Sequence, residues 1–177
     1  SSQEIMIAGL FSKINFLDVM QNFTIFEPEG GRIIKKIPRY QQFRAVHKTI
    51  ERLKTGNTTK EKSGVIWHTQ GSGKSLTMVF LTVKMRRDPE LRDYKLVFLT
   101  DRTQLDNQLT GTFTNAQNET VHHADSVKSL KGLLESDSSG IITAMVQKFQ
   151  ENANGFEFPV LNESEKIIVL ADEAHRT

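Results

Sequence analysis

Two short motifs in this sequence carry residues suited to nucleotide chemistry. Residues 71–75 read GSGKS, and residues 172–175 read DEAH. A glycine-rich loop of the first kind presents backbone N–H groups and a Lys to phosphate oxygens, with a Ser hydroxyl for Mg²⁺. The carboxylates of the second motif supply what the loop lacks, namely a hold on the metal and a base for the attacking water. The pair predicts a site that binds ATP with Mg²⁺ and hydrolyses it.

The chemistry of each side chain predicts its role at this site. Lys74 is expected to reach the β- and γ-phosphates, and Ser75 to ligate Mg²⁺. Asp172 is expected to hold the same ion through water, while Glu173 orients and deprotonates the lytic water. We therefore predict Lys74, Asp172 and Glu173 as catalytic residues and Ser75 and Asp172 as metal-binding residues. The nucleotide-binding loop is predicted to comprise Gln70, Gly71, Ser72, Gly73, Lys74 and Ser75.

The loop departs from the general pattern G-x-x-x-x-G-K-[ST] at its first position, where this chain has His68. Its context still favours phosphate binding, because an expected strand precedes the loop and an expected helix follows it. In that arrangement the helix N-terminus points its N–H groups and its dipole at the ligand. A glycine turn followed by an ordinary helix cap is the alternative interpretation.

The strands and helices that position these motifs follow from the apolar periodicity. Helices are expected over residues 40–53, from residue 75 onwards, over residues 103–109, and after an N-cap at Ser126. Buried strands are expected at residues 65–67, 96–99, 140–144 and 167–171. Short apolar strands that alternate with helices predict an α/β fold with a mainly parallel sheet. Ligands of such sheets bind at the carboxyl ends of the strands, where both motifs are expected.

The chain is expected to hold one main domain. With 177 residues, of which 37% are hydrophobic, it is long enough for a sizeable core. The run EPEGG at residues 27–31 is a turn signal. We therefore predict a helical appendage or linker over residues 1–31 and the main domain over residues 32–177.

Composition limits the cellular compartments and the kinds of binding site that are expected for this protein. The sequence has no Cys, which excludes disulfides and thiolate zinc sites and fits a reducing cytosol. Its apolar runs are far shorter than the roughly 20 residues of a membrane span, and no export signal is visible. We expect a soluble cytoplasmic protein without a membrane partner. His122 and His123 are interpreted as solvated loop residues rather than metal ligands.

Basic residues are concentrated in one segment, although the net charge is only +2. Residues 32–62 hold ten Lys or Arg side chains and two Glu side chains. Such a cluster can contact phosphates, but a solvated helix face is the commoner explanation.

Longer runs around the motifs resemble one family in order and spacing. They are RYQQFRAV (39–46), WHTQGSGKS (67–75), FLTDRTQLDNQL (98–109), TAMVQKF (143–149) and ADEAHR (171–176). Together they resemble the motor subunit, or R subunit, of type I restriction enzymes, within superfamily 2 of helicases and translocases. The run LDVMQNFTIFE at residues 17–27 is similar to the stretch that precedes the motor in that family. His68 is then the family's own variant of the loop.

The resemblance implies a fold, an activity and partners. It implies the first RecA-like domain of a P-loop NTPase, which uses ATP and Mg²⁺ to translocate double-stranded DNA before cleavage. The expected partners are duplex DNA and the methyltransferase and specificity subunits of the restriction complex. The same resemblance implies that Gln42 reads adenine, with Gln41 as the alternative, and that His175 couples nucleotide state to a facing domain. It also implies sequence-independent DNA backbone contacts by Thr100, Asp101, Arg102, Thr143, Gln147 and Lys148.

Motors of this superfamily work with two RecA-like domains, the second of which supplies an arginine finger. This chain ends at Thr177 with neither that domain nor a PD-(D/E)xK nuclease motif. We expect it to be a fragment that is nearly inactive in hydrolysis by itself, since an arginine finger contributes about 10³–10⁵ in rate. The alternatives are a strand-unwinding helicase of superfamily 2 and a non-catalytic, nucleotide-gated binding module.

Overall fold

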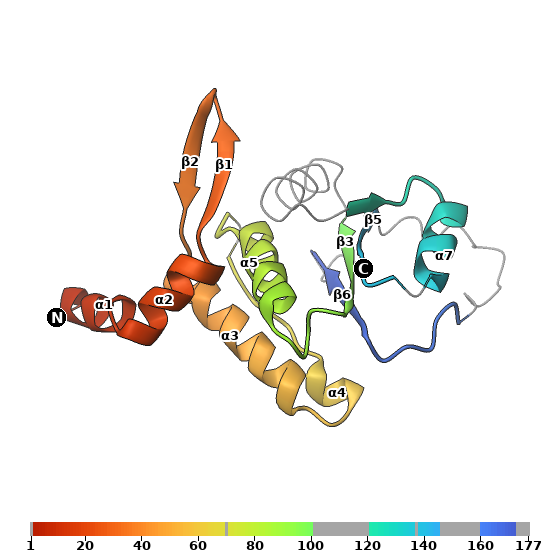
Figure 1. Ribbon diagram of the computed structural model, residues 1–177, viewed down its shortest axis with the longest axis horizontal. Helices are drawn as coiled ribbons and strands as arrows, with labels where there is room; N and C mark the ends of the chain where they lie inside the picture. The colour runs from red at the N-terminus through yellow and green to blue at the C-terminus, as the bar shows by residue number, and fades with distance from the viewer. Residues whose placement is uncertain (1, 70, 101–120, 137, 146–159, 173–177) are drawn as a thin grey trace. The chain divides into compact units, whose positions relative to one another are not determined.

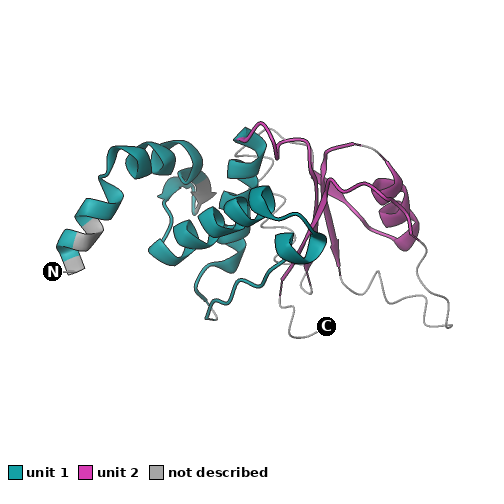
Figure 2. Ribbon diagram, turned by 90° about the horizontal axis from the view of Figure 1, so that it is seen from below, with its two compact units in different colours: residues 1–87 teal, residues 88–177 magenta. Residues whose placement is uncertain are grey.

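The computed structural model describes residues 2–69, 71–100, 121–136, 138–145 and 160–172. It divides into two compact units, residues 1–87 and residues 88–177, which are coloured separately in Figure 2. In the described ranges no helix has the length and apolar character needed to cross a bilayer.

Unit 1 consists of helices and one β-hairpin (Figure 1). In chain order its elements are α1 (Ser2–Leu10), α2 (Lys13–Asn22), β1 (Ile25–Glu29), β2 (Arg32–Lys36), α3 (Tyr40–Thr55), α4 (Thr59–Lys62) and α5 (Lys74–Arg87). The hairpin β1–β2 stands out from the helices (Figure 1).

The two longest helices, α3 and α5, form the centre of unit 1, and both confirm the prediction from periodicity. Val46, Ile50 and Leu53 line the buried face of α3, which Gly56 terminates. The buried face of α5 includes Val79, Phe80, Leu81, Val83 and Met85. In α3 the buried apolar residues recur three and four positions apart and form one stripe, whereas in α5 the consecutive residues from Val79 to Val83 are buried, so α5 is buried on more than one side.

The end of α2 packs into this core rather than standing apart from it. Phe23, which follows α2, is fully buried. Its ring centroid lies 4.9 Å from that of Phe43 on α3 and 5.4 Å from that of Phe80 on α5. Phe11, Ile14 and Leu17 of the same segment stay exposed. The sequence therefore predicted helical structure in the appendage but not which of its side chains are buried.

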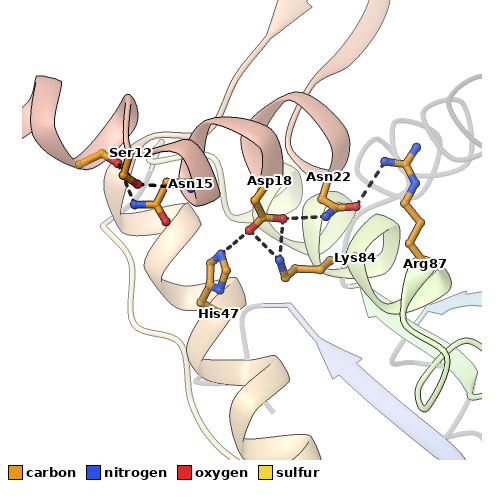
Figure 3. A network of polar contacts seen from close by, with 8 residues as sticks. Ser12, Asn15, Asp18, Asn22, His47, Lys84 and Arg87 are labelled. Atoms are coloured by element: carbon orange, nitrogen blue, oxygen red, sulfur yellow. Dashed lines mark hydrogen bonds and ion pairs between the residues drawn. The ribbon is translucent and has the colours of Figure 1, made fainter.

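A polar network beside Phe23 ties α2 to α3 and α5 (Figure 3). The Lys84 Nζ donates to both Asp18 carboxylate oxygens at 2.7 Å, and Asn22 Nδ2 donates to Asp18 Oδ1 at 2.6 Å. His47 Nε2 lies 2.7 Å from Asp18 Oδ2. Only 13% of the Asp18 side chain and 17% of the Lys84 side chain are exposed.

These surroundings shift the pKa values of Asp18 and His47. Burial raises the pKa of the Asp18 carboxyl, but hydrogen bonds from Asn22 and Lys84 and the charge of Lys84 outweigh it, so the pKa lies below its ordinary value. Burial and the charge of Lys84 lower the pKa of His47, against the opposing effect of Asp18. Asp18 is therefore charged and His47 neutral near pH 7.

Asp18→Asn is expected to lower the free energy of unfolding by roughly 1–3 kcal/mol near pH 7, because it leaves the Lys84 ammonium without a charged partner. Since the folded-state pKa of Asp18 is lowered, its contribution is present above the ordinary value of 3.8 and is lost as pH falls through the folded pKa. Chemical denaturation of both proteins at pH 7 and pH 3 measures the difference. Asp93→Asn is the matched control, since Asp93 is 64% exposed and 3.9 Å from Arg92. Equal losses from the two variants would contradict the prediction.

The β1–β2 hairpin confirms the predicted turn near residue 30. The strands pair antiparallel, with Ile25 opposite Lys36 and Glu29 opposite Arg32. Gly30 and Gly31 have φ angles of 58° and 78°, which a tight hairpin turn requires at both central positions and which glycine adopts without strain. The predicted boundary between residues 31 and 32 falls inside this turn. Residues 25–29 form a strand rather than part of a helical appendage.

The described part of unit 2 is a four-stranded parallel sheet with one helix, which confirms the predicted α/β fold. Its elements are β3 (Lys95–Thr100), β4 (Val121–His123), α7 (Val127–Glu135), β5 (Ile141–Met145) and β6 (Ile167–Ala171). The strand order is β4-β5-β3-β6, and all three pairings are parallel.

Helix α7 packs on the sheet through Leu130, which is fully buried against Val97, Ile142 and Ala144. The predicted N-cap is confirmed, since Ser126 Oγ accepts from Ser129 N at 3.1 Å. At the other end, the buried Lys95 Nζ donates to the carbonyl oxygens of Leu133, Leu134 and Ser136. A cation there satisfies carbonyls that the helix leaves open and complements its dipole.

The strand predicted at residues 65–67 is wrong. Residues 63–69 form neither helix nor strand, and Val65 and Trp67 are each 86% exposed. An apolar β-branched run indicates a local preference for extended backbone, but a strand forms only where a neighbour supplies hydrogen bonds. Among the described strands none pairs with this segment.

Two further strands differ from expectation. β6 has the predicted bounds but is not fully buried, with Val169 55% exposed. Among the described strands it pairs only with β3, which places it at the edge of the described sheet. His122 and His123 lie in strand β4 and not in a loop. This strand has only three residues, two of them adjacent His, so it lacks the apolar alternation by which a strand is predicted from sequence.

Candidate nucleotide-binding site

The phosphate loop of unit 1 leads directly into α5. Gly71 and Gly73 have φ angles of 73° and 84°, in the left-handed region that glycine adopts without strain. The first hydrogen bond within α5 runs from Thr77 N to Gly73 O at 3.1 Å. The N–H groups of Lys74, Ser75 and Leu76 precede that bond and so open the helix. The opening N–H groups of a helix, with its dipole, are a binding site for phosphate.

Hydrogen bonds between Ser72 and Thr69 also stabilise the loop. Ser72 donates to Thr69 O twice, through its N–H at 3.2 Å and through its hydroxyl at 2.6 Å. The Ser72 hydroxyl is thereby engaged inside the loop, whereas Lys74 and Ser75 are half-buried in the first turn of α5. Ser75 is consequently the hydroxyl suited to a magnesium ion beside bound phosphates. A triphosphate with Mg²⁺ fits this donor set, because N–H groups, an ammonium and a hydroxyl are brought together at one helix start.

The side chain of Gln42 on α3 contacts this loop, which could not be predicted from the sequence. Its Nε2 donates to Gly73 O at 2.9 Å, across 31 residues of chain. Only 2% of Gln42 is exposed. The prediction that Gln42 reads adenine rested on the spacing of the run RYQQFRAV, which carries no information about a partner in the loop. Gln41 is exposed.

In unit 2, predicted site residues lie where the strands end. Asp172 directly follows β6, and its N–H donates to Leu99 O on β3 at 2.9 Å. Since Leu99 is paired with Ala171, Thr100 and Asp172 terminate neighbouring strands at the same edge of the sheet. This is the edge at which parallel sheets bind ligands. The structure thus brings together two residues that the sequence assigned to different motifs.

The two Thr residues predicted to contact DNA are both buried. Thr100 Oγ1 is buried, and no hydrogen-bond partner for it occurs in the described part of the chain. Thr143 lies within β5, and its Oγ1 is 3.2 Å from His123 Nδ1. Their DNA contacts stay predictions. Other predicted features lie outside the described residues: Gln70, Asp101, Arg102, Gln147, Lys148, Glu173, His175 and the helix at residues 103–109.

Two features of this chain are typical of P-loop NTPases with a RecA-like fold. One is a parallel sheet with an Asp directly after a strand, and the other is a glycine-rich loop that leads into a helix. Comparison with known proteins agrees with that class. A sequence profile of the SWI2/SNF2 ATPases matches residues 41–177, and the chain belongs to this family of ATPases.

Relatives over nearly the whole chain are subunits of restriction enzymes. The chain is 37% identical over 182 residues to the type I restriction enzyme MjaIXP endonuclease subunit of Methanocaldococcus jannaschii, an alignment covering 100% of this chain and 17% of that protein. It is 36% identical over 179 residues to the type I restriction enzyme HindI endonuclease subunit of Haemophilus influenzae, covering 97% of this chain and 17% of that protein. These matches confirm the resemblance to type I restriction enzymes. The chain spans less than a fifth of the length of these relatives.

Proposed function

We propose that this chain is the ATP-binding first motor domain of a type I restriction enzyme subunit. ATP hydrolysis by the full-length protein would drive double-stranded DNA translocation before cleavage. The observation that carries the proposal is the phosphate loop, where two left-handed glycines lead into the N-terminus of α5 with Lys74 as its first residue. Full-chain similarity to restriction endonuclease subunits supports the DNA substrate and the multi-subunit setting.

In this proposal the residues act as follows. Lys74 holds the β- and γ-phosphates, and Ser75 and Asp172 hold Mg²⁺, the latter through water. Glu173 activates the lytic water, and His175 reports the nucleotide state to a second motor domain. The sequence-independent DNA contacts come from the residues that the resemblance assigns to them, Thr100, Asp101, Arg102, Thr143, Gln147 and Lys148. The methyltransferase and specificity subunits deliver the target site. Mg²⁺ supplies charge neutralisation at the phosphates when bound.

A triplex-displacement assay on linear duplex DNA tests the proposal. The full-length protein, assembled with its methyltransferase and specificity subunits, should displace a third strand placed far from the recognition site when given ATP and Mg²⁺. A non-hydrolysable ATP analogue is the control and should give no displacement. Separation of the duplex strands themselves would favour an unwinding helicase, and displacement without ATP would contradict a motor.

A further inference from the structure

The exposed face of α3 carries three positively charged side chains in a row. Arg44, Lys48 and Arg52 follow one another at intervals of four residues, and all three are exposed. Because an α-helix rises 1.5 Å per residue, successive members lie about 6 Å apart along its axis. Val46 and Ile50, which are buried in the core, lie on the other side of the helix. The three cations therefore form one basic stripe on the side of α3 that faces away from the core.

The described residues do not neutralise this basic stripe. Arg44 Nη1 donates to the hydroxyl of Tyr40 at 3.0 Å, and Arg52 Nε donates to the backbone carbonyl of Glu61. Both acceptors are uncharged. Glu51 is exposed on the same helix, but no ion pair within the described part of the chain joins it to a member of the stripe. Three positive charges are thus presented together without a carboxylate partner from the described residues.

The spacing of these charges differs from that of an ordinary solvated helix face. Such a face gains stability when opposite charges stand four residues apart, whereas like charges at that spacing destabilise the helix. Arg44 and Lys48 form one like-charge pair of this kind, and Lys48 and Arg52 form the next. The arrangement is therefore unfavourable for α3 by itself, and a bound polyanion would offset the repulsion.

The backbone of duplex DNA presents anions at a similar interval. Each strand carries one phosphate per about 3.4 Å of the duplex axis, so alternate phosphates of a strand lie about 7 Å apart along that axis. Members of the basic stripe recur about every 6 Å, and the long side chains of Lys and Arg can accommodate the difference. Both side chains are suited to the ligand, since Arg can bind a phosphate through two donors and Lys binds it as a point charge.

We propose that the basic stripe of α3 binds the phosphate backbone of duplex DNA. The inference rests on the proposed function, because it gives a further contact surface to the DNA substrate. None of the six residues that the resemblance assigns to DNA lies on α3. Contacts with phosphate carry no base code, so the stripe holds duplexes of any sequence equally well.

Arg44→Gln/Lys48→Gln in the full-length protein tests the inference through the salt dependence of DNA binding. Gln favours the helix and removes the charge. Fluorescence anisotropy with a duplex of arbitrary sequence gives the binding constant over a series of salt concentrations. Each lost phosphate contact reduces the slope of log K against log salt by about 0.9, so we expect the slope of the double variant to be smaller by about two. Lys13→Gln/Lys128→Gln removes the same charge at exposed positions on α2 and α7 and should leave the slope unchanged.

Two further variants keep the test decisive. Arg44→Lys/Lys48→Arg preserves both charges and should retain the slope of the wild type. Lys48→Gln alone covers the case in which the double variant fails to fold, and its slope should be smaller by about one.

Several results would overturn the inference. One is a slope that neither Gln variant changes, and another is an equal reduction in the control. Unchanged DNA binding with loss of subunit assembly would mean that the stripe contacts an acidic protein surface instead. Wild-type protein that binds no duplex by itself would also overturn it, although third-strand displacement by the assembled complex would leave the proposed function intact.

Discussion

Lys74→Ala in the full-length protein should lower the rate of ATP hydrolysis by about two to three orders of magnitude, the usual effect of removing one preorganised group that stabilises transition-state charge. Lys74 is the first residue of α5, directly after the left-handed Gly73. In the proposed site its ammonium and the helix dipole would act on the same phosphates, and the variant would lose only the ammonium. Translocation and DNA cleavage should be lost with hydrolysis.

A phosphate-release assay with saturating DNA measures this effect, and titration with a fluorescent ATP analogue and Mg²⁺ measures the accompanying loss of affinity. Lys128→Ala is the matched control, because Lys128 is exposed on α7 and has no proposed role in the site. DNA cleavage that survives Lys74→Ala would show that ATP turnover is incidental. That result would favour a nucleotide-gated binding module over a motor.

Glu173→Gln should have the second large effect, with a different kinetic signature. Glu173 follows Asp172, whose backbone is tied to β3 at the strand-end edge of the sheet. A general base contributes about 10²–10⁴ in rate, and an amide cannot take the proton of the attacking water. Hydrolysis should therefore fall by that factor while the affinity for Mg²⁺-ATP stays within about twofold of the wild type.

Single-turnover hydrolysis and equilibrium binding of the same preparation separate these two quantities. Glu163→Gln, at an exposed position of the segment before β6, is the control and should change neither. Equal losses of binding and hydrolysis would mean that Glu173 holds the nucleotide or its metal instead of acting as the base. Unchanged hydrolysis would exclude it from the chemistry.

The two long helices of unit 1 were the most predictable parts of the fold. The spacing of Val46, Ile50 and Leu53 indicated α3, and that of Val79 and Val83 indicated α5, because helical periodicity is a local property of the chain. Strands were less predictable. The apolar runs of β3, β5 and β6 were recognised, but the equally apolar Val65–Trp67 segment is exposed and unpaired among the described strands, since pairing depends on a neighbour distant in sequence.

The sequence by itself determined the chemistry of the site, because GSGKS and DEAH hold their reacting groups within a few adjacent residues. It also determined the class of fold through its alternation of apolar strands and helices. Only the tertiary structure decided which groups hold those motifs in place. The bond from Gln42 to Gly73 spans 31 residues, and that from Lys84 to Asp18 spans 66. Contacts over such separations form only when whole helices pack together, so the spacing of residues along the chain does not predict them.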